Sequence, residues 1–399
     1  MKKSLFALAA VGAFAGGAQA QSSVTVYGIY DGGYVSSNTE SKTAAGVSTR
    51  SIANGFTGNS MASTRLGFRG NEDLGGGRSA VFNIEFGISP GDGTFDNRSS
   101  VNANGAAQAP LVNQQATGTR TALVGLSDKA LGTVTLGRRT TGIHNTTLGQ
   151  YGIAGNNMAG YLNSENFAAT GGGNTINNQV QFNAVRMNNG VYYESPTISG
   201  ANLRVDFSND GATNTTFGTG NNISNLGVSG TYSAMGFRLA AATHQVKATI
   251  GAANASSTGV ISVNAIAAAA TTDTRINAAS LGYSTGGLGA EIVYAGNKTE
   301  QNGAQISKVT TTSLVTQYRT GAIMPFARYG IGKVEAAPGV ANADTSGYQI
   351  GAQYFMSKRT SLYAAYGTQK METKVSTTAT NVGHRTTKTD IGVGMIHTF

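Results

Sequence analysis

Apolar and polar side chains alternate residue by residue along most of this chain. Leu66 and Phe68, for example, are interleaved with Arg65 and Arg69. A period of two is that of a β-strand with one apolar and one polar face. Short Gly-rich turns such as residues 71–77 join these segments into pairs, and a long polar connection follows every second segment. The pattern therefore predicts a series of antiparallel β-hairpins.

The chain contains sixteen such segments. An even number of strands, with short turns at one end and long loops at the other, is typical of bacterial outer-membrane barrels. A soluble sandwich would bury its apolar faces against a second sheet and would rarely leave the opposite faces so uniformly polar. We therefore predict an all-β fold, a 16-stranded antiparallel transmembrane β-barrel with short periplasmic turns and long extracellular loops. The predicted strands and hairpins are residues 23–31, 61–70, 82–86, 119–127, 131–139, 184–196, 201–209, 224–246, 273–297, 308–333, 345–370 and 387–399.

The alternation also assigns each side chain to a face of the predicted barrel. In a bilayer the apolar face meets lipid and the polar face lines the lumen. Leu203 and Val205, for example, alternate with a polar arginine between them. By this parity, four charged residues are expected on the lumen face, namely Asp31, Arg69, Arg204 and Arg238.

One segment interrupts the pattern over residues 140–183. It is rich in Gly, Asn, Ala and Thr, carries Glu165 as its one carboxylate and holds no Lys or Arg. So long an irregular segment in a strand-patterned chain is typically either functional or disordered. We expect it to fold into the barrel and to narrow the pore.

Residues 1–20 have the pattern of an export signal. Two lysines form a basic start, an apolar stretch follows, and Ala-Gln-Ala at residues 18–20 matches a small-residue cleavage site. We expect cleavage after Ala20, with residues 21–399 as one barrel domain. The mature chain has no apolar run of the length that a membrane-spanning helix needs, about 18 residues. A closed barrel is then the way in which it could span a membrane.

Composition narrows the chemistry that the chain can perform. It contains no Cys, which excludes disulfides, thiol nucleophiles and most zinc sites. His144, His244, His384 and His397 have no Ser or Asp at a known catalytic spacing. The formal net charge is +9, but no basic stripe or nucleic-acid recognition motif is present. We therefore predict a protein that is not an enzyme, needs no metal or cofactor and binds no nucleic acid.

Several motifs together resemble the general diffusion porins of the Gram-negative outer membrane, specifically the β-proteobacterial branch. In chain order they are SSVTVYGIYDGGY, STRLGFRGNEDLGGG, TRTALVGLS, LGTVTLGRR, RMNNGVYYESPTISG and a last strand that ends in Phe399. The resemblance implies an outer-membrane channel for passive diffusion of small hydrophilic solutes and ions. It further implies a homotrimer that contacts lipid and lipopolysaccharide, and a barrel-assembly machinery that reads the terminal aromatic residue. The third extracellular loop of this family folds inward as an eyelet and corresponds to residues 140–183.

In that family, arginines on the barrel wall face acids on the inward loop. By motif, the wall arginines correspond to Arg65, Arg120 and Arg186, and a wall glutamate corresponds to Glu85. Arg65 and Arg186 alternate with apolar residues of their strands, so the pattern also places them on the inward face. Arg120 instead falls on the same face as Val124, an apolar residue of its strand. Many relatives carry a PEFGG-like acidic segment in the loop, but Glu165 stands alone here. Three arginines against two acids lead us to expect a pore that prefers anions.

Two other functions remain open. A substrate-specific channel, such as a sugar pore, typically lines its path with a row of aromatic side chains, whereas the inward positions here carry arginines. A non-conducting surface adhesin or anchor would use its long loops, for instance the low-charge residues 247–272. The inward arginines favour general diffusion of small anionic or neutral solutes.

Overall fold

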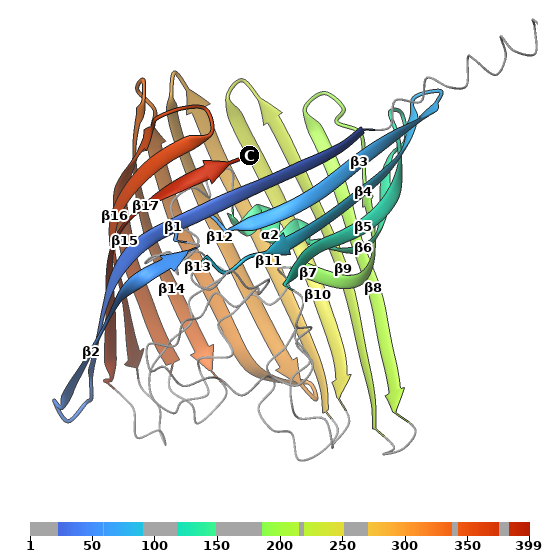
Figure 1. Ribbon diagram of the computed structural model, residues 1–399. Coiled ribbons are helices and arrows are strands. Elements are labelled where there is room, and N and C mark those ends of the chain that lie inside the picture. Colours follow the sequence, from blue (N-terminus) through green and yellow to red (C-terminus); the bar gives the residue numbers. More distant parts are fainter. Residues whose placement is uncertain are drawn as a thin grey trace, which may run out of the picture.

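The computed structural model describes residues 23–58, 60–90, 118–148, 186–214, 219–250, 270–336, 342–374 and 383–399. Most of these residues belong to antiparallel β-strands, which form one continuous sheet. The sheet closes because β1 (Ser23–Lys42) pairs with β17 (Arg385–Thr398), so the first and last strands lie side by side (Figure 1). Closure pairs the two ends of the sheet with each other, as a barrel in lipid requires.

Two of the seventeen strand segments are halves of one strand. Both β2 (Ser48–Gly58) and β3 (Arg65–Gly75) pair with β1, β2 with its second half and β3 with its first half. The chain leaves the sheet after Gly58 and returns to it at Arg65. The barrel therefore has sixteen strands, and the predicted fold is confirmed.

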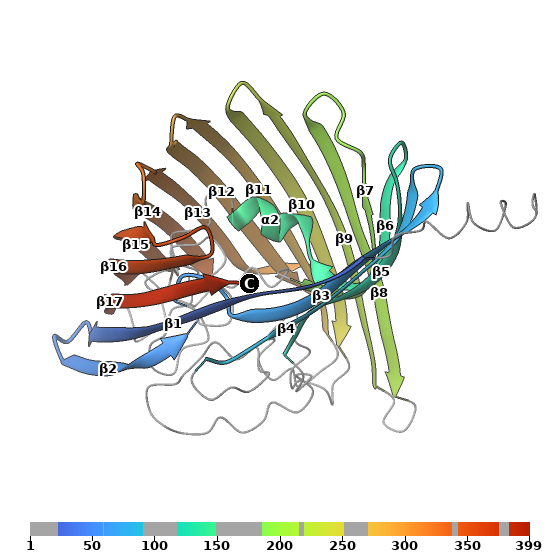
Figure 2. The ribbon, with the colours of Figure 1, turned by 45° about the horizontal axis from the view of Figure 1, so that its top comes forward.

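The remaining strands follow one another around the barrel, each paired with its neighbours in sequence. Short turns join them at the upper end of the view in Figure 1. A helix, α2 (Gly142–Leu148), lies inside the barrel (Figure 2). The strand bounds are β4 (Arg78–Gly87), β5 (Thr119–Asp128), β6 (Gly132–Thr140), β7 (Arg186–Glu194), β8 (Ala201–Asn214), β9 (Thr219–Ala234), β10 (Phe237–Ile250), β11 (Ala270–Thr285), β12 (Leu288–Gln301), β13 (Ala304–Tyr318), β14 (Ile323–Ala336), β15 (Asn342–Phe355) and β16 (Thr360–Lys374).

The outer and inner faces follow the alternation predicted from the sequence. On β12, Ile292 and Tyr294 are 46% and 48% exposed, whereas the alternate residues Glu291 and Val293 are almost fully buried. Exposed apolar side chains therefore cover the outside of the barrel, where lipid replaces water. The inside holds polar side chains together with buried apolar ones, among them Met324 and Phe326.

The first hairpin extends beyond the predicted strand limits. The alternation predicts an end at Asp31, but β1 continues to Lys42, and β2 is a strand that the alternation did not predict. Ser36 and Asn54 lie opposite each other in this extra ladder. Most side chains here are polar, and only Tyr34, Ile52 and Phe56 form an exposed apolar face, so the alternation is too sparse to mark the ladder.

The end opposite the short turns also contains one tight turn. β12 and β13 are joined by Asn302 and Gly303, which have positive φ angles of 49° and 82°. Asn-Gly favours this two-residue hairpin turn because both central residues must adopt φ above zero. The long connection predicted at this position is therefore wrong.

Candidate pore-lining site

Three charged side chains from adjacent strands meet on the inner wall. Glu85 on β4 lies between Arg65 on β3 and Arg120 on β5. Arg120 Nε donates to Glu85 Oε1 at 2.7 Å, and Arg65 Nε lies 3.5 Å from Glu85 Oε2. One carboxylate is thus shared by two guanidiniums, and we call these three residues the wall cluster. The structure brings together two of the predicted constriction arginines and the predicted wall glutamate.

A β-bulge directs Arg120 to the inner wall. The ladder between β4 and β5 pairs Glu85 with Thr121 and then Phe86 with Thr119, so that Arg120 is the extra residue. Unbroken alternation would place Arg120 on the same outer face as Val124. A bulge locally breaks that alternation and re-aims the inserted side chain. It explains why the parity of Arg120 disagrees with its position beside Glu85.

Tyr27 on β1 supports the wall cluster. Its hydroxyl donates to Asn83 Oδ1 at 2.8 Å and lies 3.1 Å from Glu85 Oε2. The Arg69 guanidinium carbon lies 5.1 Å from the centroid of the Tyr27 ring, within the range of a cation–π contact. A Cβ at Gly67 would come within 2.3 Å of this ring, so only glycine lets the ring lie across β3.

A second group of charges surrounds Tyr192 on the inner face of β7. Arg204 Nε donates to Asp206 Oδ1 at 2.6 Å, and Arg139 Nη2 donates to Glu194 Oε2 at 3.4 Å. Both guanidinium carbons lie 5.5 Å from the centroid of the Tyr192 ring. Because Arg204 and Asp206 are both buried, loss of either partner would leave an uncompensated charge. We call these five residues the Tyr192 cluster.

The start of helix α2 is anchored to the Tyr192 cluster. The Gly142 N–H donates to Asp206 Oδ2 at 2.6 Å, and a Cβ at Gly142 would come within 2.0 Å of Ser229 Oγ. The buried side chain of Ile143 then packs against the inner walls of β10, β11 and β12. The predicted constriction segment therefore enters the lumen at its start. The buried residues in contact around Ile143 are Ala242, Ile276, Ala278 and Ala295.

The two other predicted constriction residues are not placed in the wall cluster. Arg186 is half-buried at the start of β7 and pairs with Thr140, while Met187 lies opposite Arg139. Glu165 lies outside the described residues, as does most of the segment that contains it. The roles of Arg186 and Glu165 in a constriction therefore stay predictions.

The predicted lumen residues Arg69, Arg204 and Arg238 all lie on the inner wall. The contacts of the first two are those given above. Arg238 Nη1 lies 3.4 Å from Glu291 Oε1 and 3.5 Å from Ser280 Oγ. Each of these arginines is therefore held by a neighbouring strand rather than extended freely into the lumen.

Asp31, the fourth predicted lumen residue, holds the chain at the break between β2 and β3. Its Oδ2 accepts the N–H groups of Met61 at 2.6 Å and Ala62 at 2.8 Å, and its Oδ1 accepts the Tyr363 hydroxyl at 2.8 Å. The side chain is buried, so Asp31 faces inward as predicted but anchors backbone instead of lining water. We call residues 60–64, which it tethers inside the barrel, the lumen link.

Neither a metal site nor a spanning helix is found in the described part of the chain. No three His, Cys, Asp or Glu side chains gather there closely enough to hold a metal ion. Nor does any helix there combine the length and hydropathy needed to cross a membrane.

The family assignment comes from the whole sequence. The profile of the Gram-negative porins matches residues 7–374. The chain belongs to the Gram-negative porin family. This porin is therefore a protein of the outer membrane and not an enzyme, as the sequence predicts.

Two relatives are similar to parts of this porin. An outer membrane porin protein of Bordetella pertussis is 31% identical over 214 residues, which cover 52% of this chain and 48% of the relative. Outer membrane porin protein 32 of Delftia acidovorans is 48% identical over 111 residues, which cover 26% of this chain and 29% of the relative. The chain therefore matches about half of the first relative's length and less than a third of the second's.

Solved porin structures share the fold. An anion-selective porin from Comamonas acidovorans superposes with a TM-score of 0.63 at 22% identity, covering 95% of this chain and all of that one. OmpT of Vibrio cholerae, described as a trimer form, superposes with a TM-score of 0.55 at 14% identity, covering 95% and 99% of the two chains. At these identities the similarity establishes a common barrel.

Several residues of the inner wall were not singled out from the sequence. Tyr27 and Tyr192 have the inward parity of their strands, and Arg139 follows Thr135 at the spacing of one strand face. Parity could therefore have placed all three inside the barrel. It could not have shown that the two tyrosine rings lie beneath guanidiniums, because these contacts join different strands and two of them, Arg69–Tyr27 and Arg139–Tyr192, span more than 40 residues of sequence.

Proposed function

We propose that this porin forms a water-filled channel for the passive diffusion of small hydrophilic solutes and ions, and that the channel prefers anions. The wall cluster carries the proposal. In it, Arg65 and Arg120 share the single carboxylate of Glu85, which leaves one positive charge in excess on the inner wall. Rings of arginine bias a pore toward anions.

The size of the effect follows from the surroundings of the charges. Water in the lumen keeps the effective dielectric high, so one charge contributes about 1 kcal/mol at close range and less in salt. Several arginines on the same wall add to this term, because their fields overlap within a screening length of about 10 Å at 0.1 M salt. The proposal also agrees with a structural relative that is described as an anion-selective porin.

The described aromatic side chains favour general diffusion over a sugar-specific path. Tyr27 and Tyr192 both lie beneath arginines, in contact with the wall. A sugar channel would instead present aromatic faces to the solute along its path. We therefore propose small anionic or neutral solutes as the cargo, without a dedicated sugar site.

We further propose that the predicted constriction segment, residues 140–183, narrows this lumen. Its first turn, α2, already lies inside the barrel against β10 to β12. Arg186 would face the segment from the start of β7, and Glu165 would supply its one acid. Signal cleavage after Ala20 would precede barrel assembly.

The proposed assembly is a homotrimer in contact with membrane lipid and lipopolysaccharide. The broad apolar outer wall supports it, since such a surface needs lipid or a second copy to cover it. A trimer should run on a gel well above the monomer mass and shift to that mass after heating. Identical migration of heated and unheated samples at monomer mass would argue for a monomeric barrel.

Selectivity can be measured directly in planar bilayers. We expect the reversal potential in a potassium chloride gradient to show chloride preference for the wild-type channel. Replacing Arg120 and Arg186 by Ser should shift the potential toward potassium, whereas Arg78→Ser, at the exposed first residue of β4, should leave it unchanged. A wild-type channel that already prefers potassium at low salt would refute the anion preference. The potassium preference would then come from acids such as Asp92 and Asp96, which lie outside the described residues.

A further inference from the structure

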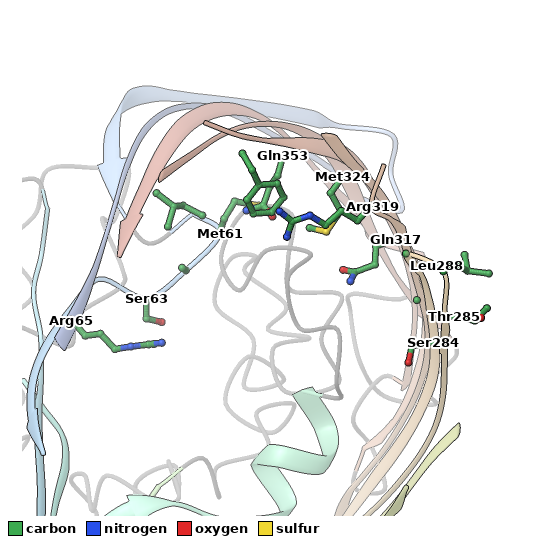
Figure 3. Close-up of a pocket in the computed structure, with 16 residues that line it drawn as sticks. Met61, Ser63, Arg65, Ser284, Thr285, Leu288, Gln317, Arg319, Met324 and Gln353 are labelled. Carbon is green, nitrogen blue, oxygen red and sulfur yellow. The ribbon is translucent and has the colours of Figure 1, made fainter. Parts of the chain in front are cut away.

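A cavity of about 780 Å³ opens inside the barrel at its short-turn end (Figure 3). One side is formed by the lumen link and Arg65, and the other by the ends of β11 to β15 and of β17. This volume lies within the range of small-molecule binding pockets. The lining includes Met61, Arg65, Gln317, Arg319, Met324 and Phe355.

The lining combines positive charge with apolar surface. Arg65 and Arg319 point into the space from different sides (Figure 3), and no acidic side chain is among the described residues that line it. The Arg319 guanidinium carbon lies 4.0 Å from the centroid of the Phe355 ring. In the described part of the chain, no carboxylate forms an ion pair with Arg319. A guanidinium held on an aromatic face keeps its N–H groups available to a carboxylate.

The apolar part of the lining is built into the wall. Met61 and Met324 are 4% and 3% exposed, and Met61 packs in one cluster with Val315, Phe326 and Tyr363. The Asp31 carboxylate fixes the position of the lumen link through two backbone N–H groups. The cavity is thus bounded by anchored residues on the side where a ligand's apolar part would lie.

We propose that this cavity is a binding subsite for organic anions that carry a carboxylate on an aromatic or compact apolar body. Arg319, with the amides of Gln317 and Gln353 nearby, supplies the donors for the carboxylate. Phe355 supplies the apolar surface, backed by the buried side chains of Met61 and Met324. A small inorganic anion would meet the charges alone and gain nothing from that surface. The inference rests on the proposed channel function and adds a preferred solute class at the short-turn mouth.

Block of the chloride current tests the subsite, with benzoate and acetate as the paired probes. Benzoate added at the short-turn side should reduce the single-channel chloride current of the wild type at lower concentration than acetate does. In Arg319→Gln the half-blocking benzoate concentration should rise by roughly five-fold, the loss expected for one partly screened charge contact. Lys358→Gln removes the same charge from a turn at the same mouth and should leave the block unchanged.

A second variant separates charge from shape. Phe355→Leu retains Arg319 but removes the aromatic face, so it should reduce the difference between benzoate and acetate block. Equal block of the wild type by both probes would overturn the proposal, as would equal benzoate block in Arg319→Gln and Lys358→Gln. A heat-dependent gel shift confirms that each variant is folded. If Arg319→Gln does not fold, Arg319→Met, which also removes the charge, takes its place.

The reversal potential, measured on the same bilayers, distinguishes this inference from the proposed selectivity. If the wild type shows no chloride preference but Arg319→Gln still weakens benzoate block, the subsite stands and the anion preference fails. If chloride is preferred but Arg319→Gln and Lys358→Gln are blocked alike, the anion preference stands and the subsite fails.

Discussion

At the residue scale, Glu85 determines how much of the wall charge is neutralised. Its side chain is 13% exposed and lies between Arg120 at 2.7 Å and Arg65 at 3.5 Å. Tyr27 adds a hydroxyl within 3.1 Å of the same carboxylate. The site is therefore a shared ion pair, in which the acid holds both guanidiniums in place and also reduces their net charge.

Glu85→Gln should make the channel more selective for anions. Removing the acid leaves two unneutralised guanidiniums on the wall, and each close charge contributes about 1 kcal/mol in watery surroundings. The ratio of chloride to potassium permeability, obtained from the reversal potential, should rise by up to roughly five-fold. Glu335→Gln removes an exposed acid that pairs with Lys308 outside the lumen and should have no effect. A shift toward potassium in Glu85→Gln would show that the wall cluster does not set selectivity.

At the element scale, the break between β2 and β3 shapes the lumen. A continuous second strand would keep all of its residues in the wall, whereas residues 60–64 cross into the barrel. Their backbone N–H groups, which lose their sheet partners there, are satisfied by the Asp31 carboxylate. These hydrogen bonds offset the cost of burying the carboxylate, so Asp31 serves as an anchor for the lumen link.

Asp31→Asn should loosen the lumen link. The amide has only one acceptor oxygen, so either the link N–H groups or the Tyr363 hydroxyl loses its partner. Leaving such a buried group unsatisfied costs about 1–3 kcal/mol. The temperature at which the folded barrel collapses on a gel should fall, while Asp344→Asn, at an exposed ion pair, should leave it unchanged. Equal collapse temperatures for Asp31→Asn and the wild type would mean that the link is held by other contacts.

At the scale of the whole molecule, the two ends of the chain close the barrel. Gly28 N–H donates to Phe399 O at 3.0 Å, and Phe399 N–H donates to Gly28 O at 3.1 Å. The Phe399 ring covers Gly28 so closely that a Cβ there would lie 2.3 Å from it. Phe399 thus contributes two backbone hydrogen bonds and a lipid-facing ring where β1 pairs with β17. We call this pairing the seam.

Deleting Phe399 should lower the amount of porin in the outer membrane. The seam between β1 and β17 then loses two backbone hydrogen bonds and its apolar cover, and an unpaired edge in lipid is costly. Quantifying the folded protein in purified outer membranes would measure this, with Phe399→Tyr as the variant that retains ring and backbone. If the deletion assembles as well as the wild type, the seam does not depend on its last residue.

The amino-acid sequence determined the number of strands, the face of most side chains and the family. Each of these depends on local alternation and on the order of motifs. Both can be read from the sequence without knowing which residues of neighbouring strands meet. Only the tertiary structure decided that Arg120 turns inward, that Asp31 tethers the lumen link and that Tyr192 lies beneath two arginines. The bulge at Arg120, for instance, exists only because β4 and β5 pair in a particular register. Contacts between strands that are distant in sequence leave no periodic signal in either strand, so the barrel was predictable and much of its inner wall was not.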